Sequence, residues 1–103
     1  MQKMTKKKAV TLLADVPEDK RFRCSDGRVF KNLSELENAL NDMTAEIFRY
    51  HSSEGKSDFA NWVRDVIRDE ELARNLSESS NAIQAARSVR ERVTWLKGKI
   101  QPK

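Results

Sequence analysis

The most regular hydrophobic pattern of the chain lies between residues 57 and 67. Its apolar positions recur at the spacing of one helix face, and the polar positions between them point the other way. The apolar positions are Phe59, Trp62, Val63, Val66 and Ile67. Ser57 is a favourable N-cap, and Asp58 suits the positive end of the helix dipole. The pattern predicts a helix that begins at Asp58 and buries an aromatic face in the protein's own core.

Two longer stretches show the same periodicity. Asn32 and Glu35 are spaced as a helix-capping pair. One continuous apolar stripe follows them, at Leu33, Leu36, Leu40, Met43 and Ile47. The last stretch carries a seam at Ala82, Ala86, Val89, Val93, Leu96 and Ile100. Because this seam spans fewer than three heptads, it favours packing within a bundle over a separate coiled coil. Asp69 can cap a shorter helix between the two stretches.

A short hairpin is predicted near the start, where Asp26 and Gly27 lie between two aromatic positions and glycine readily takes the positive φ of a tight turn. We therefore expect a mostly α fold, a small single-domain helical bundle with three or four main helices and a short N-terminal β-hairpin. Residues 1–15 are expected to form a basic N-terminal arm or short helix. Residues 16–103 are expected to form a single compact α-rich domain.

Composition limits the size of the core and the compartment. The chain has 103 residues, of which 38% are hydrophobic and 35% are charged, so one thin core is expected. No apolar run approaches the roughly 18 residues that cross a bilayer. Cys24 is the one cysteine and has no partner for an internal disulfide, as is typical of reducing compartments. We expect an intracellular, cytoplasmic protein with no membrane partner.

Three motifs in order give a family resemblance: the C-x-D-G hairpin, the segment NLSELENALNDM and the D-F-x-x-W-V helix. Together they resemble a family of short, uncharacterised archaeal and bacterial domains, over roughly residues 16–98. The resemblance implies a small, mostly helical domain that stands alone. It implies nothing about catalysis, because no activity is known for that family.

Catalytic chemistry has one candidate pair, Cys24 and His51, with Asp26 or Asp58 as a third member. A cysteine beside an aromatic residue in a hairpin is more typically a small buried residue, and the chain has no glycine-rich oxyanion loop. Cysteine and histidine together supply two strong ligands, whereas structural zinc takes four. We therefore expect a non-catalytic protein without a metal or cofactor.

Charge is distributed in three blocks. Residues 1–31 contain nine Lys or Arg and four acidic residues, residues 32–81 contain five and eleven, and residues 82–103 contain six and one. Basic ends of this kind can bind the phosphates of nucleic acid. Alternatively, the basic ends fold against the acidic middle and are neutralised within the protein. The sequence leaves both alternatives open.

Nucleic-acid association is the first functional hypothesis. The candidate contacts are Lys6, Lys7, Lys8, Arg87, Arg90 and Lys97. Arg92 and Lys99 lie on the other side of the last helix, so its basic surface is expected to be split. Trp95 lies off the apolar seam and is a candidate for stacking on a base, with a partly buried side contact as the alternative.

The alternative function is a protein-protein adaptor. In that case Trp62 and Trp95 would bind the partner, since aromatic residues anchor many interfaces. A homodimer through the seam of residues 82–100 is a variant of the same hypothesis. Burial of Trp62 within the domain would weigh against it.

Overall fold

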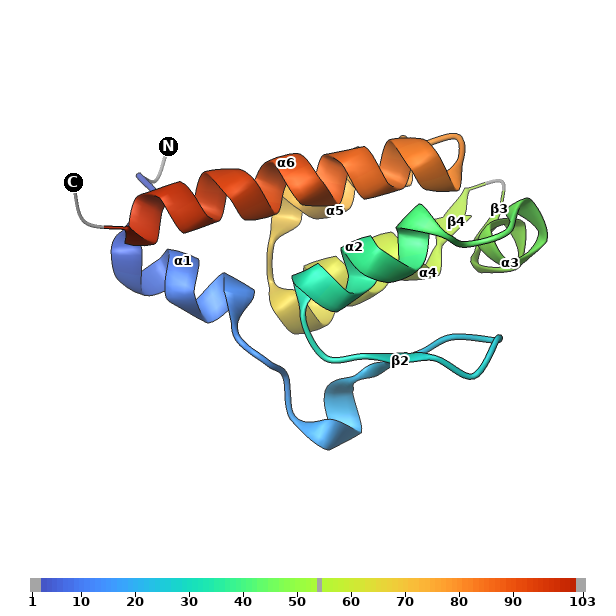
Figure 1. Ribbon diagram of the computed structural model, residues 1–103, viewed down its shortest axis with the longest axis horizontal. Helices are drawn as coiled ribbons and strands as arrows, with labels where there is room; N and C mark the ends of the chain where they lie inside the picture. The colour runs from blue at the N-terminus through green and yellow to red at the C-terminus, as the bar shows by residue number, and fades with distance from the viewer. Residues whose placement is uncertain (1–2, 54, 102–103) are drawn as a thin grey trace.

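The computed structural model describes residues 3–53 and 55–101. Its α-helices are α1 (Lys6–Leu13), α2 (Leu33–Asn41), α3 (Ala45–His51), α4 (Asp58–Trp62), α5 (Glu70–Ser77) and α6 (Ala82–Ile100), and a 3-10 turn, η1, spans Glu18–Lys20. Two antiparallel hairpins pair β1 (Phe22–Arg23) with β2 (Val29–Phe30) and β3 (Ser52–Ser53) with β4 (Lys56–Ser57). The expected class, mostly α with a short hairpin near the start, is confirmed (Figure 1).

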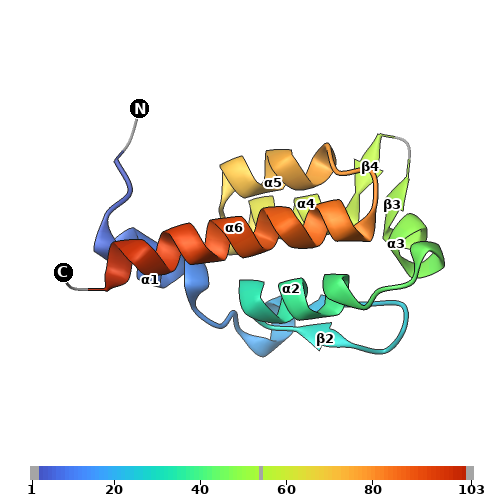
Figure 2. The ribbon, with the colours of Figure 1, turned by 45° about the horizontal axis from the view of Figure 1, so that its top comes forward.

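Helix α6 runs along the molecule and organises the other helices. It contacts α1, α2 and α5, and Figure 2 shows α5 and α2 on its two sides. Ala82, Ala86, Val89, Val93 and Leu96 of its predicted seam are buried in the core. The seam therefore holds this domain together and is not exposed for a homodimer. No helix in the described part of the chain is both long and apolar enough to cross a bilayer.

The N-terminal segment is a helix over residues 6–13 and not a loose arm. Thr5 caps α1 by accepting a hydrogen bond of 3.1 Å from the backbone N–H of Lys8. Ala9 and Leu12 of this helix are buried, and α1 packs against α6. Of the two alternatives for residues 1–15, the short helix is thus observed, and it shares the core of the rest of the domain. The boundary expected at residue 16 does not separate two structural units.

The stripe predicted from Leu33 to Ile47 is divided between two helices. α2 ends at Asn41, and the hydroxyl of Thr44 accepts a hydrogen bond of 3.1 Å from the N–H of Ile47 to begin α3. Apolar spacing of three and four residues continues across the break, which is why the pattern did not reveal it. The structure has more helices than the three or four expected, because the stripe is divided into α2 and α3 and because residues 6–13 form α1.

The first hairpin has the predicted turn. The N–H of Gly27 donates to the carbonyl of Cys24, the N–H of Cys24 donates to the carbonyl of Arg28, and Gly27 has a φ of 96°. This is a three-residue loop whose last position requires a left-handed backbone. Phe22 and Phe30 pair across the two strands with their rings stacked, at a centroid distance of 5.4 Å.

We expect Gly27→Ala to destabilise the protein by about 1 to 2 kcal/mol, because a β-carbon is strained at positive φ. Gly98→Ala is the matched control. A β-carbon at Gly98 meets no atom within 4 Å, and the residue lies in a helix, so alanine should stabilise the protein by up to about 1 kcal/mol. Urea unfolding of both variants measures the two effects. Loss of stability in both, or in neither, would contradict the assignment of this turn.

The aromatic face of residues 58–67 lies in the core, as predicted. Phe59 is 1% exposed and Trp62 is 7% exposed. The ring of Phe59 stacks on Phe22 and Phe48 at centroid distances of 5.2 and 5.8 Å. The indole N–H of Trp62 donates a 2.8 Å hydrogen bond to the carbonyl of Lys20. In this conformation Trp62 is a core residue and cannot anchor a partner protein.

The end of this helical stretch departs from a regular α-helix. Val63–Ile67 form a π-helical turn, η2, and Arg68 follows with a φ of 75°. The backbone N–H groups of Arg68 and Asp69 both donate to the carbonyl of Val63, at 2.8 and 3.1 Å. Single π turns and left-handed non-glycine residues occur often at functional sites. The turn directs residues 68–71 toward the C-terminal half of α6, where they line a cleft.

Candidate functional site

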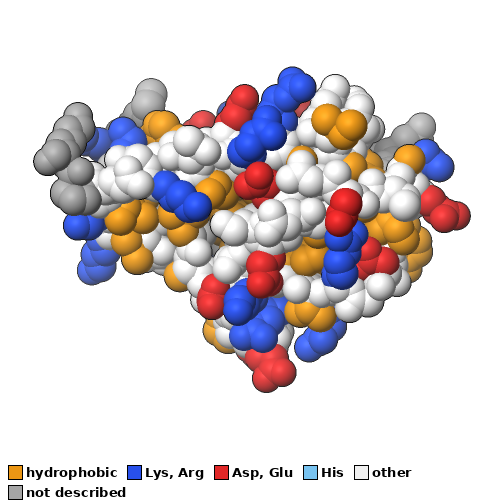
Figure 3. All heavy atoms as spheres, in the orientation of Figure 1, with side chains coloured by type: hydrophobic (Ala, Val, Ile, Leu, Met, Phe, Trp, Pro, Cys, Tyr) orange, Lys and Arg blue, Asp and Glu red, His pale blue; other side chains and the backbone are white. Residues whose placement is uncertain are grey.

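The predicted basic residues do not line one common cleft. Arg87, Arg90 and Lys97 are exposed at positions three and seven residues apart, so they share one flank of α6. Lys6, Lys7 and Lys8 are exposed on α1. Of these six, Lys8 alone lines the cleft that contains Trp95. On the face shown in Figure 3, basic and acidic side chains are interspersed.

The alternative of internal neutralisation is observed for two cations of the basic blocks. Arg92 binds Asp69 through two hydrogen bonds of 2.7 and 3.0 Å, and Arg28 binds Asp42 at 2.7 Å. The six predicted contacts make no ion pair with any residue that the structure describes. The acidic middle therefore neutralises only part of the basic ends.

The Trp95 cleft lies between α1, the start of α5 and the C-terminal half of α6. Its volume is about 470 Å³, and Lys3, Met4, Lys8, Leu12, Arg68, Asp69, Glu70, Glu71, Arg92, Trp95 and Lys99 line it. Five of these residues are basic and three are acidic. Trp95 is 42% exposed, and unlike the other exposed apolar side chains it lines a cleft rich in charged residues.

Trp95 is flanked by two cations of its own helix. The guanidinium carbon of Arg92 lies 4.7 Å from the centre of the indole, and Nζ of Lys99 lies 5.0 Å from it. The spacing of three and four residues places all three side chains on one flank of α6. This flank is opposite to the one that carries Arg87, Arg90 and Lys97.

Arg92 is held in place by a buried carboxylate. The side chain of Asp69 is 1% exposed and that of Arg92 is 12% exposed. Asp69 also accepts a hydrogen bond from the N–H of Leu72, which caps α5. The two hydrogen bonds to Asp69 hold the guanidinium, and the indole of Trp95 lies against it. Arg92 therefore forms a wall of the cleft that a buried carboxylate holds, and the exposed Lys99 also lines the cleft.

Cys24 and His51 do not form a catalytic relay. His51 is buried, its Nδ1 lies 3.0 Å from a carboxylate oxygen of Asp58, and its Nε2 accepts a 3.0 Å hydrogen bond from the N–H of Ser25. The nitrogen that would act as a base is thus occupied by the backbone. Burial raises the pKa of the Cys24 thiol above its ordinary value, which disfavours the thiolate. The histidine ties the first hairpin to α3 and α4.

Asp26 beside this hairpin turn predicts a specific pH dependence. Hydrogen bonds from Arg28 lower the pKa of Asp26 from 3.8 to about 2. A lowered carboxyl pKa favours the folded state at every pH above the ordinary value and loses this contribution as the pH falls toward 2. We expect the difference in melting temperature between the wild type and Asp26→Asn to be constant above about pH 5 and to shrink between pH 4 and 2. A melting-temperature difference that stays the same from about pH 4 to pH 2 would contradict the lowered pKa of Asp26.

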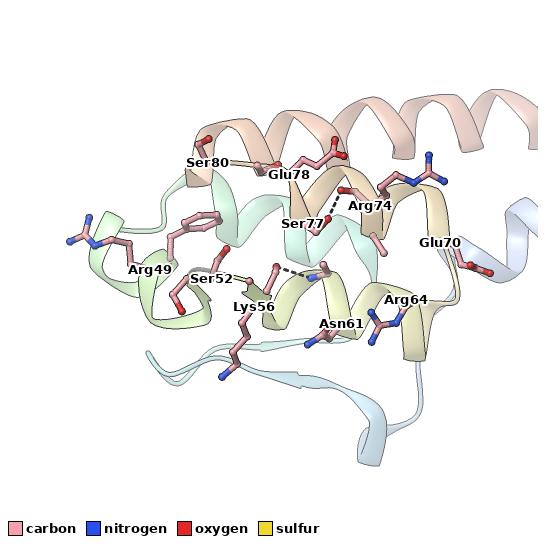
Figure 4. A pocket seen from close by; sticks show the side chains of 17 residues that line it. Arg49, Ser52, Lys56, Asn61, Arg64, Glu70, Arg74, Ser77, Glu78 and Ser80 are labelled. Atoms are coloured by element: carbon pink, nitrogen blue, oxygen red, sulfur yellow. Dashed lines mark hydrogen bonds between the residues drawn. The ribbon is translucent and has the colours of Figure 1, made fainter.

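A second, larger groove lies between α5 and the β3–β4 hairpin with α4, and its volume is about 1040 Å³. In Figure 4 its basic side chains point in different directions and do not converge; they are Arg49, Lys56, Arg64 and Arg74. Ser57 is used as the cap of α4, accepting from the N–H of Ala60, and Ser77 donates to the carbonyl of Arg74. Because its polar side chains do not point toward one place, this groove is a weaker candidate for a binding site than the Trp95 cleft.

The Trp95 cleft contains four basic residues that the sequence analysis did not name as binding residues. Arg92 and Lys99 could have been found, because their spacing from Trp95 is that of neighbours on a helix face. Lys3 and Arg68 could not, since only the packing of α1 and the π turn brings them to α6. Within the described residues no cluster of side chains suits a metal ion.

The resemblance of the hairpin and helix motifs to a family of small domains stays a prediction. No family model, curated protein or solved structure matches this chain.

Proposed function

We propose that the protein binds nucleic acid through the Trp95 cleft, without catalysis. The observation that carries the proposal is a partly exposed tryptophan among basic side chains from both ends of the chain. Lysine and arginine supply most of the affinity for a phosphate backbone, and an aromatic ring supplies contact with a base. The cleft combines both within one small site.

Charge in the cleft favours an anionic ligand by a modest margin. Arg92 and Asp69 neutralise one another, which leaves Lys3, Lys8, Arg68 and Lys99 against Glu70 and Glu71. The two glutamates lie at the first turn of α5. A phosphate is expected on the α1 side of the cleft, near Lys3 and Lys8, and away from the glutamates.

The adaptor hypothesis has weaker support. Trp62 is buried, and the seam of α6 is used within the domain. Tyr50 and Ile83 are each 70% exposed, on α3 and at the start of α6. Single exposed apolar residues are normal on a protein surface and do not mark an interface.

The test is a binding titration with two variants that remove equal charge. The first variant is Lys3→Gln/Lys8→Gln/Lys99→Gln, in the cleft. The second is Arg87→Gln/Arg90→Gln/Lys97→Gln, on the opposite flank of α6. We expect the cleft variant to bind a fluorescent 20-nucleotide probe at least tenfold more weakly. The slope of log binding constant against log salt concentration should become shallower by up to about two to three. The flank variant should lose much less.

The matched control separates the site from net charge. Equal losses in both variants would show that only overall charge matters and would contradict the cleft as the interface. A larger loss in the flank variant would move the interface to the predicted residues of α6. No binding of the wild type at low salt would remove the proposed function.

A further inference from the structure

We infer that the Trp95 cleft takes one unpaired base, so that the protein prefers single-stranded nucleic acid to a duplex. This inference rests on the proposed function and specifies its ligand. The cleft volume of about 470 Å³ lies in the range of sites for small molecules, roughly 300 to 1,000 Å³. A site of this size suits one nucleotide and not the width of a double helix.

The walls of the cleft fit the flat face of a base. Trp95 supplies an aromatic plane, and the partly buried Met4 adds apolar surface beside it. Stacking on such a plane requires a base whose face is uncovered. In a duplex the faces are covered by neighbouring base pairs, and only the edges are reachable in the grooves.

The guanidinium of Arg92 restricts the indole of Trp95 before any ligand arrives. Arg92 lies 4.7 Å from the centre of the ring and is itself fixed by the buried carboxylate of Asp69. A fixed ring loses little conformational freedom when a base stacks on it, which favours binding. The strained backbone at Arg68, with a φ of 75°, holds a further cation at the same cleft.

Lys99 links base and phosphate recognition. Its ammonium lies 5.0 Å from the ring centre, and the side chain is exposed. A base that stacks on the indole from this side takes the place of the ammonium. The displaced ammonium, on a flexible stem, then binds the phosphate of the same nucleotide. Lys3 and Lys8 are placed for the adjacent phosphate.

The test compares a labelled 12-nucleotide single strand, as DNA and as RNA, with the duplex of the same sequence at one salt concentration. We expect the single strands to bind more tightly than the duplex. Trp95→Ala should weaken single-strand binding by about 5- to 100-fold and weaken duplex binding by a much smaller factor, because no base face in the duplex is free to stack on the ring. Trp95→Phe keeps a ring and should retain most of the affinity.

Intrinsic fluorescence gives a second readout on the same samples. Trp62 is 7% exposed and hydrogen-bonded, so quenching by a single strand should come from Trp95 and disappear in Trp95→Phe. One contrary result is that Lys3→Gln/Lys8→Gln/Lys99→Gln loses binding while Trp95→Ala does not. Another is that the duplex binds as tightly as the single strand. Either result would contradict this inference and leave the proposed function in place. If no nucleic acid binds, both fall.

Discussion

Phe59→Ala is expected to lower the free energy of unfolding by about 3 to 5 kcal/mol. The side chain is 1% exposed and stacks on Phe22 and Phe48, which come from the first hairpin and from α3. Its loss would open a cavity where three separate segments meet. Because small domains are stable by about 5 to 15 kcal/mol in total, this change removes a large share. Thermal and urea unfolding followed by circular dichroism measure it.

Two further variants make this prediction decisive. Phe59→Leu leaves a smaller cavity and should lose less stability, and it supplies a measurement if Phe59→Ala does not fold. Ile83→Ala removes a side chain that is 70% exposed and should change stability by less than about 0.5 kcal/mol. A loss at Phe59 no greater than the loss at Ile83 would contradict a core centred on this ring.

Asp69→Ala should also destabilise the protein by about 3 to 5 kcal/mol. The change removes the cap of α5 and the two hydrogen bonds that Asp69 accepts from Arg92, whose side chain is 12% exposed, and leaves the guanidinium only the exposed carboxylate of Glu71, 3.7 Å away. Removal of one partner from a buried ion pair costs far more than loss of a surface pair, because the remaining charge stays desolvated. Urea unfolding of the single variants Asp69→Ala and Arg92→Ala and of the double variant measures the coupling.

The double variant should be less destabilised than the sum of the two single variants, since it leaves no unpaired charge. Asp65→Ala is the surface control, because Asp65 pairs with Arg64 while both side chains are largely exposed. Its unfolding midpoint should be nearly that of the wild type. Additive single-variant effects, or a large effect at Asp65, would contradict the role given to Asp69.

Asp69 also connects stability with the candidate site. It fixes Arg92, and Arg92 lies against Trp95. Asp69→Asn keeps an acceptor for the N–H of Leu72 but weakens the hold on the guanidinium. We expect a folded protein in which the indole is less well fixed. This variant therefore separates the order of the cleft from the integrity of the core.

Local signals in the sequence were reliable where a few neighbouring residues decide the outcome. The side chains of Asn32, Ser57 and Asp69 cap α2, α4 and α5 as predicted. Gly27 takes the positive φ that the hairpin requires. Caps and tight turns depend on hydrogen bonds between residues about two to four positions apart. Their conformations can therefore be predicted from the local sequence.

Interruptions within periodic stretches were not visible. The pattern runs through the break between α2 and α3, although Thr44 offers a cap at that point. A π turn adds one residue to a helical turn and leaves no mark in the apolar spacing, and Arg68 takes a left-handed backbone without being glycine. At Arg68 the tertiary structure determined the backbone over local preference, whereas at Thr44 the local cap was present and the continuous apolar spacing concealed it.

The sequence by itself determined the mostly helical class, the first hairpin, the buried aromatic face and the excess of basic residues at both ends. Only the tertiary structure decided which of those basic residues meet: Lys3 and Lys8 join Lys99 and Trp95, whereas Arg87, Arg90 and Lys97 lie on the other flank of α6. The physical reason is that periodicity sets the face of each helix separately. Which faces of distant helices lie together depends on how the whole core packs.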